Sequence, residues 1–111
     1  MSRDDATLLD IVAAAQAGVA FVAGLDKQAF LSDAKTQAAV LHQITLVGEA
    51  TKRLSPAFRK RHTDIPWKDI AGMRDQLIHH YDRVDLNLVW AVVHDRLPEL
   101  LNELEPLVPK Q

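Results

Sequence analysis

The segment MRDQLIHHYD at positions 73–82 gathers the side chains of this chain that are best suited to chemistry. It contains Arg74, His79 and Tyr81 within eight positions. Histidine changes its protonation state near neutral pH, and a guanidinium group can bind a phosphate through two parallel hydrogen bonds while keeping its charge. These residue types are able to bind phosphate and to move a proton. A structural explanation stays open, because arginine and histidine near the C-terminal end of a helix also interact favourably with the helix dipole.

Other catalytic chemistries lack their usual sequence patterns. The chain contains no cysteine, which excludes disulfides, thiolate nucleophiles and cysteine-bound zinc or iron–sulfur clusters. His79 and His80 would point about 100° apart on a helix and could not bind one ion together. There is no HExxH pair, P-loop, GxGxxG loop or serine elbow, and the other histidines stand alone in the sequence: His42, His62 and His94. We therefore expect neither a metal nor a cofactor.

A cluster of basic residues lies in a different part of the sequence. It contains no acidic residue and consists of Lys52, Arg53, Arg59, Lys60 and Arg61, with His62 adjacent. The formal net charge of the chain is −2, so any attraction to nucleic acid must come from such local clustering. The cluster is either a solvated helix end with its loop or a surface that contacts phosphate groups.

Length and composition indicate one soluble domain over residues 1–111. A chain of 111 residues with 48% hydrophobic residues can form one core but not two. The most apolar stretch, 11–25, is interrupted by Gln16 and Gly18 and is shorter than the roughly 18 to 20 residues that a membrane span needs. No export signal is evident and cysteine is absent, so we expect a cytoplasmic protein without membrane contact.

The first helix is expected to begin at Asp4 or Asp5 and to end near Gly24. Further apolar residues occur on faces other than its main hydrophobic stripe: Ala13, Ala14, Ala17, Ala20 and Phe21. A helix that is apolar on more than one side needs cover on more than one side. A homodimer interface would supply that cover.

The second long helix is expected to begin at Ser32 and to carry its hydrophobic stripe as far as Leu54. Gly48 interrupts this helix. A glycine inside a helix costs about 1 kcal/mol relative to alanine, so a compensating benefit is expected. Close approach of another backbone at Gly48 is the simplest such benefit.

Two further start signals follow in the sequence. Ser55 and Pro56 have the order of an N-cap and a first-turn proline, which predicts a short helix. The stretch DIPW at 64–67 repeats the signal and opens the helix that is expected to carry the segment 73–82.

The last helix is expected to begin at Asp82 or Asp85 and to bend at Pro98. No segment alternates with the period of two that marks a strand, and no internal repeat is present. The sequence therefore predicts an all-α fold, an up-and-down antiparallel bundle of four to five helices.

Several short motifs occur in a characteristic order along the chain. They are VGEA at 47–50, IPW at 65–67, GMRDQLIHHY at 72–81, VD at 84–85 and VW at 89–90. This order resembles the HepT-like branch of the HEPN superfamily over almost the whole chain. It includes the pattern Arg-x-x-x-x-His-x-Tyr as Arg74, His79 and Tyr81. Asp75 stands where this family most often carries asparagine, which adds a negative charge beside Arg74.

The resemblance implies a metal-independent endoribonuclease, typically the toxin of a two-gene module whose antitoxin is a minimal nucleotidyltransferase. Such cleavage uses the 2′-hydroxyl of the RNA as nucleophile, so the protein must supply a proton carrier and a stabiliser of phosphate charge. His79 and Arg74 would be these catalytic residues. The partner would silence the toxin by transferring AMP to Tyr81. Candidate RNA contacts are Asp75, His80, Lys52, Arg53, Arg59 and Arg61, and DNA is not expected as a partner.

Helix geometry adds a constraint to this site. Arg74 and His79 would be roughly 140° apart around one regular helix and would not share a face. Either the helix loosens before His79, or a second subunit across a twofold axis completes the site, as the dimers typical of HEPN nucleases would allow. Arg74 and Tyr81 would lie on one stripe, about 10 Å apart along the axis.

Two other functions remain open. The chain could be a non-catalytic HEPN module that restrains or positions a nucleotidyltransferase partner. It could also be a degenerate structural dimer, which Asp75 and the modest overall charge would favour.

Overall fold

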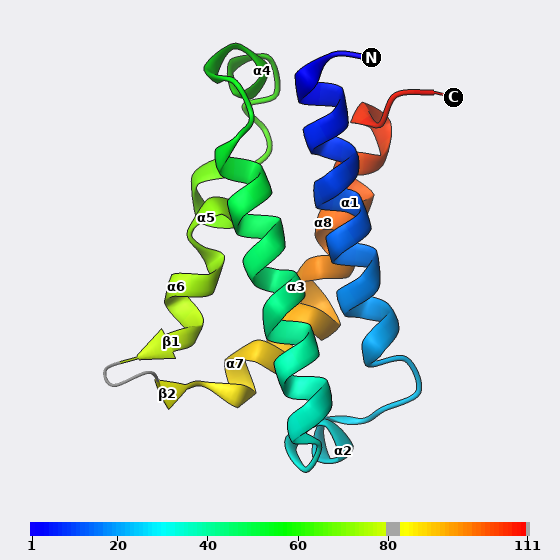
Figure 1. Ribbon diagram of the computed structural model, residues 1–111, viewed down its shortest axis with the longest axis vertical. Coiled ribbons are helices and arrows are strands. Elements are labelled where there is room, and N and C mark those ends of the chain that lie inside the picture. The colour runs from blue at the N-terminus through cyan, green and yellow to red at the C-terminus, as the bar shows by residue number, and fades with distance from the viewer. Residues whose placement is uncertain (80–82, 111) are drawn as a thin grey trace.

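Two long helices, α1 (Arg3–Phe21) and α3 (Ala34–Lys52), lie side by side and run in opposite directions through the molecule (Figure 1). A third helical rod packs against α1. It consists of α7 (Leu86–Ala91), a π-helical turn (Val92–Arg96) and α8 (Leu97–Leu104). The helices α1 and α3 and this third rod form the main body of the bundle.

Shorter elements complete the chain in a computed structural model that describes residues 1–79 and 83–110. They are α2 (Lys27–Leu31), α4 (Pro56–Arg61), α5 (Trp67–Ala71), α6 (Met73–Leu77), β1 (Ile78–His79), β2 (Arg83–Val84) and a final 3-10 turn (Glu105–Leu107). Both α5 and α6 pack against α3 and lead down the molecule in Figure 1 toward the β1–β2 hairpin. The predicted all-α, up-and-down fold is confirmed, with the small hairpin and several short helices added to it.

The start of α1 is fixed by Ser2. The Ser2 hydroxyl accepts a hydrogen bond from the Asp5 amide at 3.0 Å, and the Asp5 carboxylate accepts one from the Ser2 amide at 3.4 Å. The expected caps, Asp4 or Asp5, are therefore wrong, because Asp5 completes a capping box from inside the first turn. The helix ends at Phe21, and Gly24 follows with a φ of 80°, which glycine adopts without strain.

The start of α3 also differs from the expectation. Its N-cap is Asp33, whose carboxylate accepts hydrogen bonds from the Thr36 hydroxyl at 2.6 Å and the Thr36 amide at 3.1 Å. These two bonds hold the pKa of Asp33 below its ordinary value. Ser32, the expected cap, instead ends α2 and donates its hydroxyl to the carbonyl of Gln28 at 2.7 Å.

The close approach expected at Gly48 is confirmed. A β-carbon at this position would lie 3.1 Å from the carbonyl oxygen of Ala71, the last residue of α5. Glycine therefore lets α3 and α5 come closer than any other residue would allow. This contact offsets the roughly 1 kcal/mol that a glycine costs inside a helix.

Ser55 and Pro56 start α4 as the sequence indicates. The Ser55 hydroxyl accepts a hydrogen bond from the Phe58 amide at 3.1 Å, and Pro56 occupies the first turn. The Asp4 carboxylate of α1 accepts hydrogen bonds from the Ser55 hydroxyl at 2.7 Å and the Ser55 amide at 2.9 Å. Both bonds hold the pKa of Asp4 below its ordinary value of 3.8. They join the first turn of α1 to the start of α4.

The last rod begins at one of the two expected positions. Asp85 caps α7 by accepting a hydrogen bond from the Leu88 amide at 3.1 Å, whereas Asp82 lies outside the described residues. A π-helical turn, Val92–Arg96, directly precedes Pro98, which lies in the first turn of α8. Proline is tolerated in a first turn, because its missing amide hydrogen has no partner there, and the bend expected at Pro98 stays a prediction.

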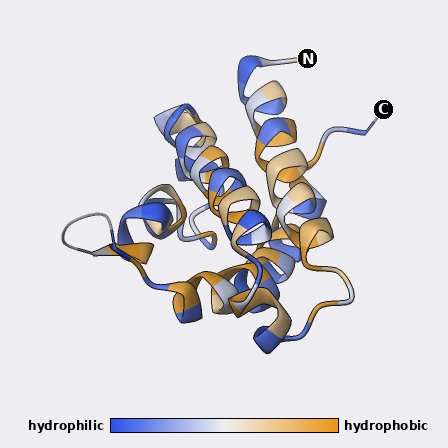
Figure 2. Cartoon of the chain, turned by 60° about the horizontal axis from the view of Figure 1, so that its bottom comes forward, coloured by the Kyte–Doolittle hydropathy of each residue, from blue (hydrophilic) through white to orange (hydrophobic). Residues whose placement is uncertain are grey.

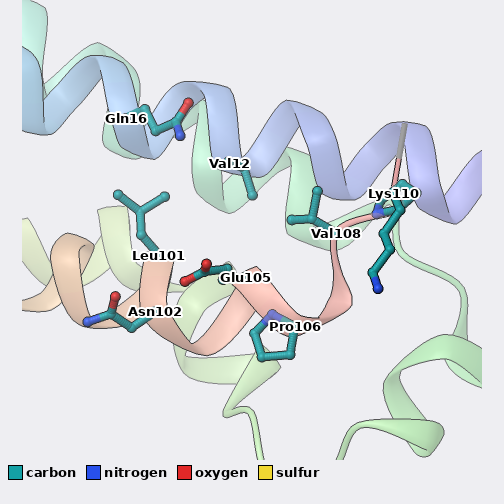
Figure 3. Close-up of a pocket in the computed structure, with 9 residues that line it drawn as sticks. Val12, Gln16, Leu101, Asn102, Glu105, Pro106, Val108 and Lys110 are labelled. Carbon is teal, nitrogen blue, oxygen red and sulfur yellow. The ribbon is translucent and has the colours of Figure 1, made fainter.

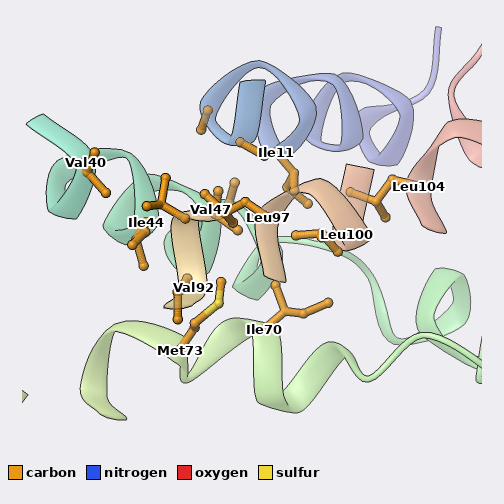
Figure 4. Packing of buried hydrophobic residues seen from close by; sticks show 14 of the residues in the cluster. Ile11, Val40, Ile44, Val47, Ile70, Met73, Val92, Leu97, Leu100 and Leu104 are labelled. Carbon is orange, nitrogen blue, oxygen red and sulfur yellow. The ribbon is translucent and has the colours of Figure 1, made fainter. Parts of the chain in front are cut away.

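The core lies between α1, α3, the α5–α6 segment and the last rod (Figure 4). Its fully buried side chains include Leu8, Ile11, Phe30, Val40, Ile44, Val47, Leu77, Val89, Leu97, Leu100 and Leu104. Hydrophilic and hydrophobic residues alternate around the long helices in Figure 2, as expected when one face of each helix enters a core. Leu77 belongs to this core, so the end of α6 is anchored to the bundle.

The outer side of α1 is only partly covered. Ala13 and Ala20 are exposed, and Phe21 retains 44% of its surface, while Ala14 is buried and Ala17 half-buried. An apolar strip of α1 therefore faces solvent in the single chain. Within the described part of the chain, no helix combines the length and the hydropathy needed to cross a bilayer.

Candidate functional site

Arg74 lies in the first turn of α6, directly after a break between two helices. Gly72 both closes α5 and opens α6. The amide of Asp75 donates to the carbonyl of Gly72 at 3.1 Å, three residues back, where a regular α-helix bonds four residues back. The segment 67–77 is therefore two short helices rather than the single helix expected from the DIPW start signal.

The second of these helices ends before the first histidine. Leu77 is fully buried, and Ile78 already has extended backbone angles, with φ −112° and ψ 120°. β1 pairs antiparallel with β2 so that His79 lies opposite Arg83, and the Asp85 amide donates to the Leu77 carbonyl at 2.8 Å. The continuous helix expected as far as the tyrosine is therefore wrong. Strand pairing satisfies backbone groups that a helix would otherwise have satisfied.

Of the two arrangements that helix geometry left open, the structure shows the first feature, a helix that ends before His79, and completion of the site by a second subunit stays a prediction. The helix ends before His79, so the separation calculated for a regular helix does not apply to it. The expected stripe that joins Arg74 and Tyr81 on one helix also loses its basis, because α6 ends at Leu77. Tyr81 and His80 themselves lie outside the described residues.

Arg74 is accessible at the surface. Its side chain is 47% exposed, and its Nη1 lies 3.7 Å from Oδ1 of Asp75, whose side chain is 75% exposed. Ion pairs this exposed contribute at most about 1 kcal/mol, because water and salt screen them. A phosphate offers two oxygens to the guanidinium group and can displace Asp75 from it.

The hairpin adds a cation that the sequence analysis missed. Arg83 is exposed on β2 and is the register partner of His79 on β1. Opposite residues of an antiparallel pair have α-carbons about 4.5 to 5.5 Å apart. Arg83 lies outside the pattern Arg-x-x-x-x-His-x-Tyr, and only the strand pairing reveals its closeness to His79. The one local signal is a basic residue two positions beyond Tyr81.

The basic cluster lies at the α4 end of the molecule, away from the hairpin (Figure 1). Arg59 has a structural role there. Its Nη2 donates to the carbonyl oxygens of Thr51 and Lys52 at 2.9 and 3.0 Å, at the C-terminal end of α3. Both carbonyls belong to the last turn of α3, where regular helical partners are missing, and the Thr51 carbonyl also accepts a hydrogen bond from the Leu54 amide at 3.2 Å. Arg59 therefore caps the C-terminal end of α3.

Other members of the cluster also have neighbours inside the chain. Nη2 of Arg53 lies 3.5 Å from the Asp10 carboxylate, and Nζ of Lys52 lies 3.3 Å from Glu49. The guanidinium carbon of Arg61 lies 5.8 Å from the centre of the Phe58 ring. Within one chain, the structure does not bring the expected RNA contacts Lys52, Arg53, Arg59 and Arg61 together with Arg74.

A groove of about 340 Å³ borders the hairpin. Its lining comes from α3, from β2 and from the start of α7: Ala34, Gln37, Ala38, Leu41, Val84 and Leu86. A larger groove of about 730 Å³ lies between α1 and the C-terminal segment (Figure 3). None of its lining residues belongs to the segment 72–85, so its size does not make it the candidate site.

The described polar groups suit an anionic ligand. Within residues 1–79 and 83–110, no three His, Asp or Glu side chains are grouped as ligands of a metal ion. Arg74 on α6 and Arg83 on β2 are both exposed, and guanidinium groups bind phosphate and carboxylate oxygens.

The helical bundle, with Arg74 on the short helix α6 and His79 on the strand that follows it, agrees with the all-α fold of a HEPN-type domain. The family model described as "Ribonuclease HepT-like" matches residues 11–107. The chain belongs to the HepT-like family of the HEPN superfamily.

Several relatives support this assignment. A protein of Thermococcus cleftensis, named as a candidate ribonuclease HepT, is 42% identical over 78 residues, which are 70% of this chain and 71% of the relative. A candidate RNase of Caldanaerobacter subterraneus subsp. tengcongensis is 36% identical over 81% of this chain and 80% of its own length. A candidate RNase of Methanocaldococcus jannaschii is 32% identical over 95% of this chain and 98% of its own length. No solved structure is significantly similar to the chain.

Proposed function

We propose that this chain is a metal-independent endoribonuclease in which Arg74 and His79 are the catalytic residues. Membership in the HepT-like family and the RNase names of its relatives support this activity. The observation that carries the proposal is the junction of α6 and β1. It exposes Arg74 on the helix and places His79 on a strand opposite a second arginine, Arg83.

The proposed reaction uses the RNA itself as nucleophile. His79 takes the proton of a 2′-hydroxyl, the 2′-oxygen bonds to the adjacent phosphorus, and the bond from phosphorus to the 5′-oxygen breaks. The departing 5′-oxygen takes a proton from solvent, which leaves a 2′,3′-cyclic phosphate and a 5′-hydroxyl end. Arg74 binds the non-bridging oxygens and stabilises their added charge in the transition state. DNA has no 2′-hydroxyl and is not a substrate.

We assign the chain to a cytoplasmic toxin–antitoxin module in which a minimal nucleotidyltransferase silences the nuclease at Tyr81. The phenolic oxygen of Tyr81 attacks the α-phosphorus of ATP on the partner, pyrophosphate leaves, and the phenolic proton passes to solvent. The AMP that remains carries a negatively charged phosphodiester two positions from His79 in the sequence. It would compete with RNA for Arg74 and Arg83.

The active form of the proposed enzyme is a homodimer. The apolar strip on α1, formed by Ala13, Ala20 and Phe21, is exposed in the single chain and would be covered by a second copy. Covering such a strip removes apolar surface from water, which favours association.

The activity is tested by incubating purified chain with RNA in the presence of a metal chelator. We expect cleavage that yields cyclic phosphate ends, and we expect Arg74→Ala and His79→Ala each to lower the rate about a hundredfold or more. Lys27→Ala provides a control, because it removes an exposed cation from α2, outside the hairpin. Equal cleavage by the wild type and His79→Ala would refute the catalytic role.

A second candidate function is a non-catalytic module that restrains the nucleotidyltransferase. The observation in its favour is Asp75, whose carboxylate lies 3.7 Å from the Arg74 guanidinium. Expression of this chain alone separates the two functions. A nuclease toxin should arrest growth in a manner that Arg74→Ala abolishes, whereas a restraining module should be harmless alone.

A further inference from the structure

The joint between α5 and α6 packs against a glycine of α3, Gly48. The β-carbon that Gly48 lacks would lie 3.1 Å from the carbonyl oxygen of Ala71 and 3.6 Å from that of Ile70. These carbonyls belong to the last turn of α5, immediately before Gly72, at which the chain turns into α6. Arg74 follows the joint by two residues.

The joint is also anchored on both of its sides. Ile70 before it and Met73 after it are 1% and 5% exposed, and Figure 4 shows both pointing into the buried cluster. Arg74 projects from the same short helix with 47% of its side chain exposed. Because these two side chains are fixed in the core, the joint cannot move along it to make room. A displacement of the Ala71 carbonyl therefore shifts α6 and with it the position of the Arg74 guanidinium group.

We propose that Gly48 is a positioning residue for Arg74: by admitting the Ala71 carbonyl against α3, it fixes the joint from which α6 presents the guanidinium group. The inference rests on the proposed ribonuclease function, in which that group binds the phosphate. A reacting group displaced by 1 Å can lose about a hundredfold in rate, so a shift of a few tenths of an ångström should lower it about tenfold.

Gly18 provides a matched control in the same chain. A β-carbon at Gly18 would also lie 3.1 Å from its nearest neighbour, but that neighbour is the Cδ1 methyl of Leu97. Both glycines lie within 19-residue helices and both are buried. The two alanine substitutions therefore add the same methyl at the same initial distance. One meets a rigid backbone carbonyl, and the other meets the end of a side chain that can rotate.

The experiment compares Gly48→Ala with Gly18→Ala by three measurements: kcat and KM for RNA cleavage, the melting temperature, and the NMR signal of the Met73 methyl group. Met73 reports on the joint directly, because the only other methionine, Met1, is 80% exposed at the N-terminus. We expect Gly48→Ala to shift the Met73 signal and to lower kcat about tenfold, with a smaller change in KM, well below its melting temperature. Gly18→Ala should leave kcat and the Met73 signal close to wild type.

Each outcome of this comparison decides the inference. A folded Gly48→Ala variant with wild-type kcat overturns it, and so does an equal loss of kcat in Gly18→Ala. If Gly48→Ala does not fold, Ala71→Gly loosens the joint from the other side and must lower kcat, so a wild-type kcat there also overturns it. Failure of the proposed function is distinguishable, because the wild type itself would then not cleave RNA. In that case an unshifted Met73 signal in Gly48→Ala would still refute the positioning contact.

Discussion

Arg74 and Asp75 place opposite charges next to each other at the start of α6, 3.7 Å apart. The carboxylate is well exposed and holds no part of the core together, so its main effect is electrostatic. It reduces the attraction of Arg74 for a phosphate without blocking access to the guanidinium group. We therefore propose that Asp75 weakens phosphate binding by Arg74, and its expected contact to RNA stays a prediction.

Replacement of this carboxylate tests its effect directly. Asp75→Asn should raise kcat/KM for RNA about two- to fivefold, which corresponds to the energy of one exposed ion pair. This gain in kcat/KM should disappear at high salt, because screening weakens the repulsion between the Asp75 carboxylate and the RNA phosphate in the wild type. Asp69→Asn is the control, since it removes an exposed carboxylate from the neighbouring helix α5. An Asp75→Asn variant no faster than Asp69→Asn would show that Asp75 does not restrain the site.

At the scale of elements, the molecule is joined by contacts between helix ends. The Asp4 carboxylate in the first turn of α1 accepts two hydrogen bonds from Ser55, the N-cap of α4. Ser55 in turn accepts one from Phe58 within α4. One serine therefore starts its own helix and ties it to the N-terminal turn of the chain.

The stability that the hydrogen bonds between Asp4 and Ser55 contribute should depend on pH. The pKa of Asp4 is lower in the folded chain than its ordinary value of 3.8, chiefly because of the hydrogen bond from the Ser55 hydroxyl. Its contribution to stability is therefore complete above about pH 4 and is lost as the pH falls through the lowered pKa. Urea unfolding at pH 7 and pH 3 should show a smaller acid-dependent loss in Asp4→Asn than in the wild type. Asp64→Asn, which changes an exposed carboxylate, should retain the wild-type loss, and equal behaviour of the two variants would contradict the role of Asp4.

The boundaries of elements show how far local sequence can be trusted. Ser55 and Pro56 start their helix as expected, because both cap signals act within four residues. The end of α6 is different. Apolar spacing continues to Ile78 as if the helix went on, but Ile78 is extended and strand pairing with β2 takes over. The end of α6 is therefore set by a contact between two segments separated along the chain. A local sequence pattern cannot predict such a contact.

At the scale of the whole molecule, the basic cluster lies apart from Arg74. The molecule is 41 Å long, with the basic cluster at the α4 end and Arg74 beside the hairpin. Arg59 is engaged with the carbonyls that end α3, and Arg53 and Lys52 have acidic neighbours. This arrangement favours the structural interpretation of the cluster, as a helix end, for these three residues.

Association of two copies is the prediction that belongs to this scale. Light scattering after size exclusion should give twice the mass of the chain for the wild type. Ala13→Glu should shift it toward the monomer, because a charge within the apolar strip of α1 could not be covered without losing its hydration. Ala57→Glu on α4 provides the control, since it adds the same charge to an exposed helix elsewhere. A monomeric wild type, or no difference between the two variants, would refute the α1 interface.

The overall bundle could be predicted because each long helix carries its own apolar stripe. The close contact at Gly48 could be predicted because a glycine inside a helix lowers its stability unless another contact compensates. The motif residues Arg74 and His79 could also be selected from residue type and order. Their mutual arrangement could not, because it depends on the break at Gly72 and on pairing between β1 and β2. Arg83 was missed for the same reason, since its relation to His79 exists only across the hairpin.

The hydrogen bond from the Asp85 amide to the Leu77 carbonyl, at 2.8 Å, closes a loop whose two ends are fixed independently of what lies between them. Leu77 is anchored in the core, and Asp85 caps the helix that follows. Apart from Val84, which packs against the core, the positions between these two ends can therefore be substituted during evolution without removing either anchor. One scaffold could in this way exchange one RNA preference for another, or lose the chemistry altogether, while keeping its shape.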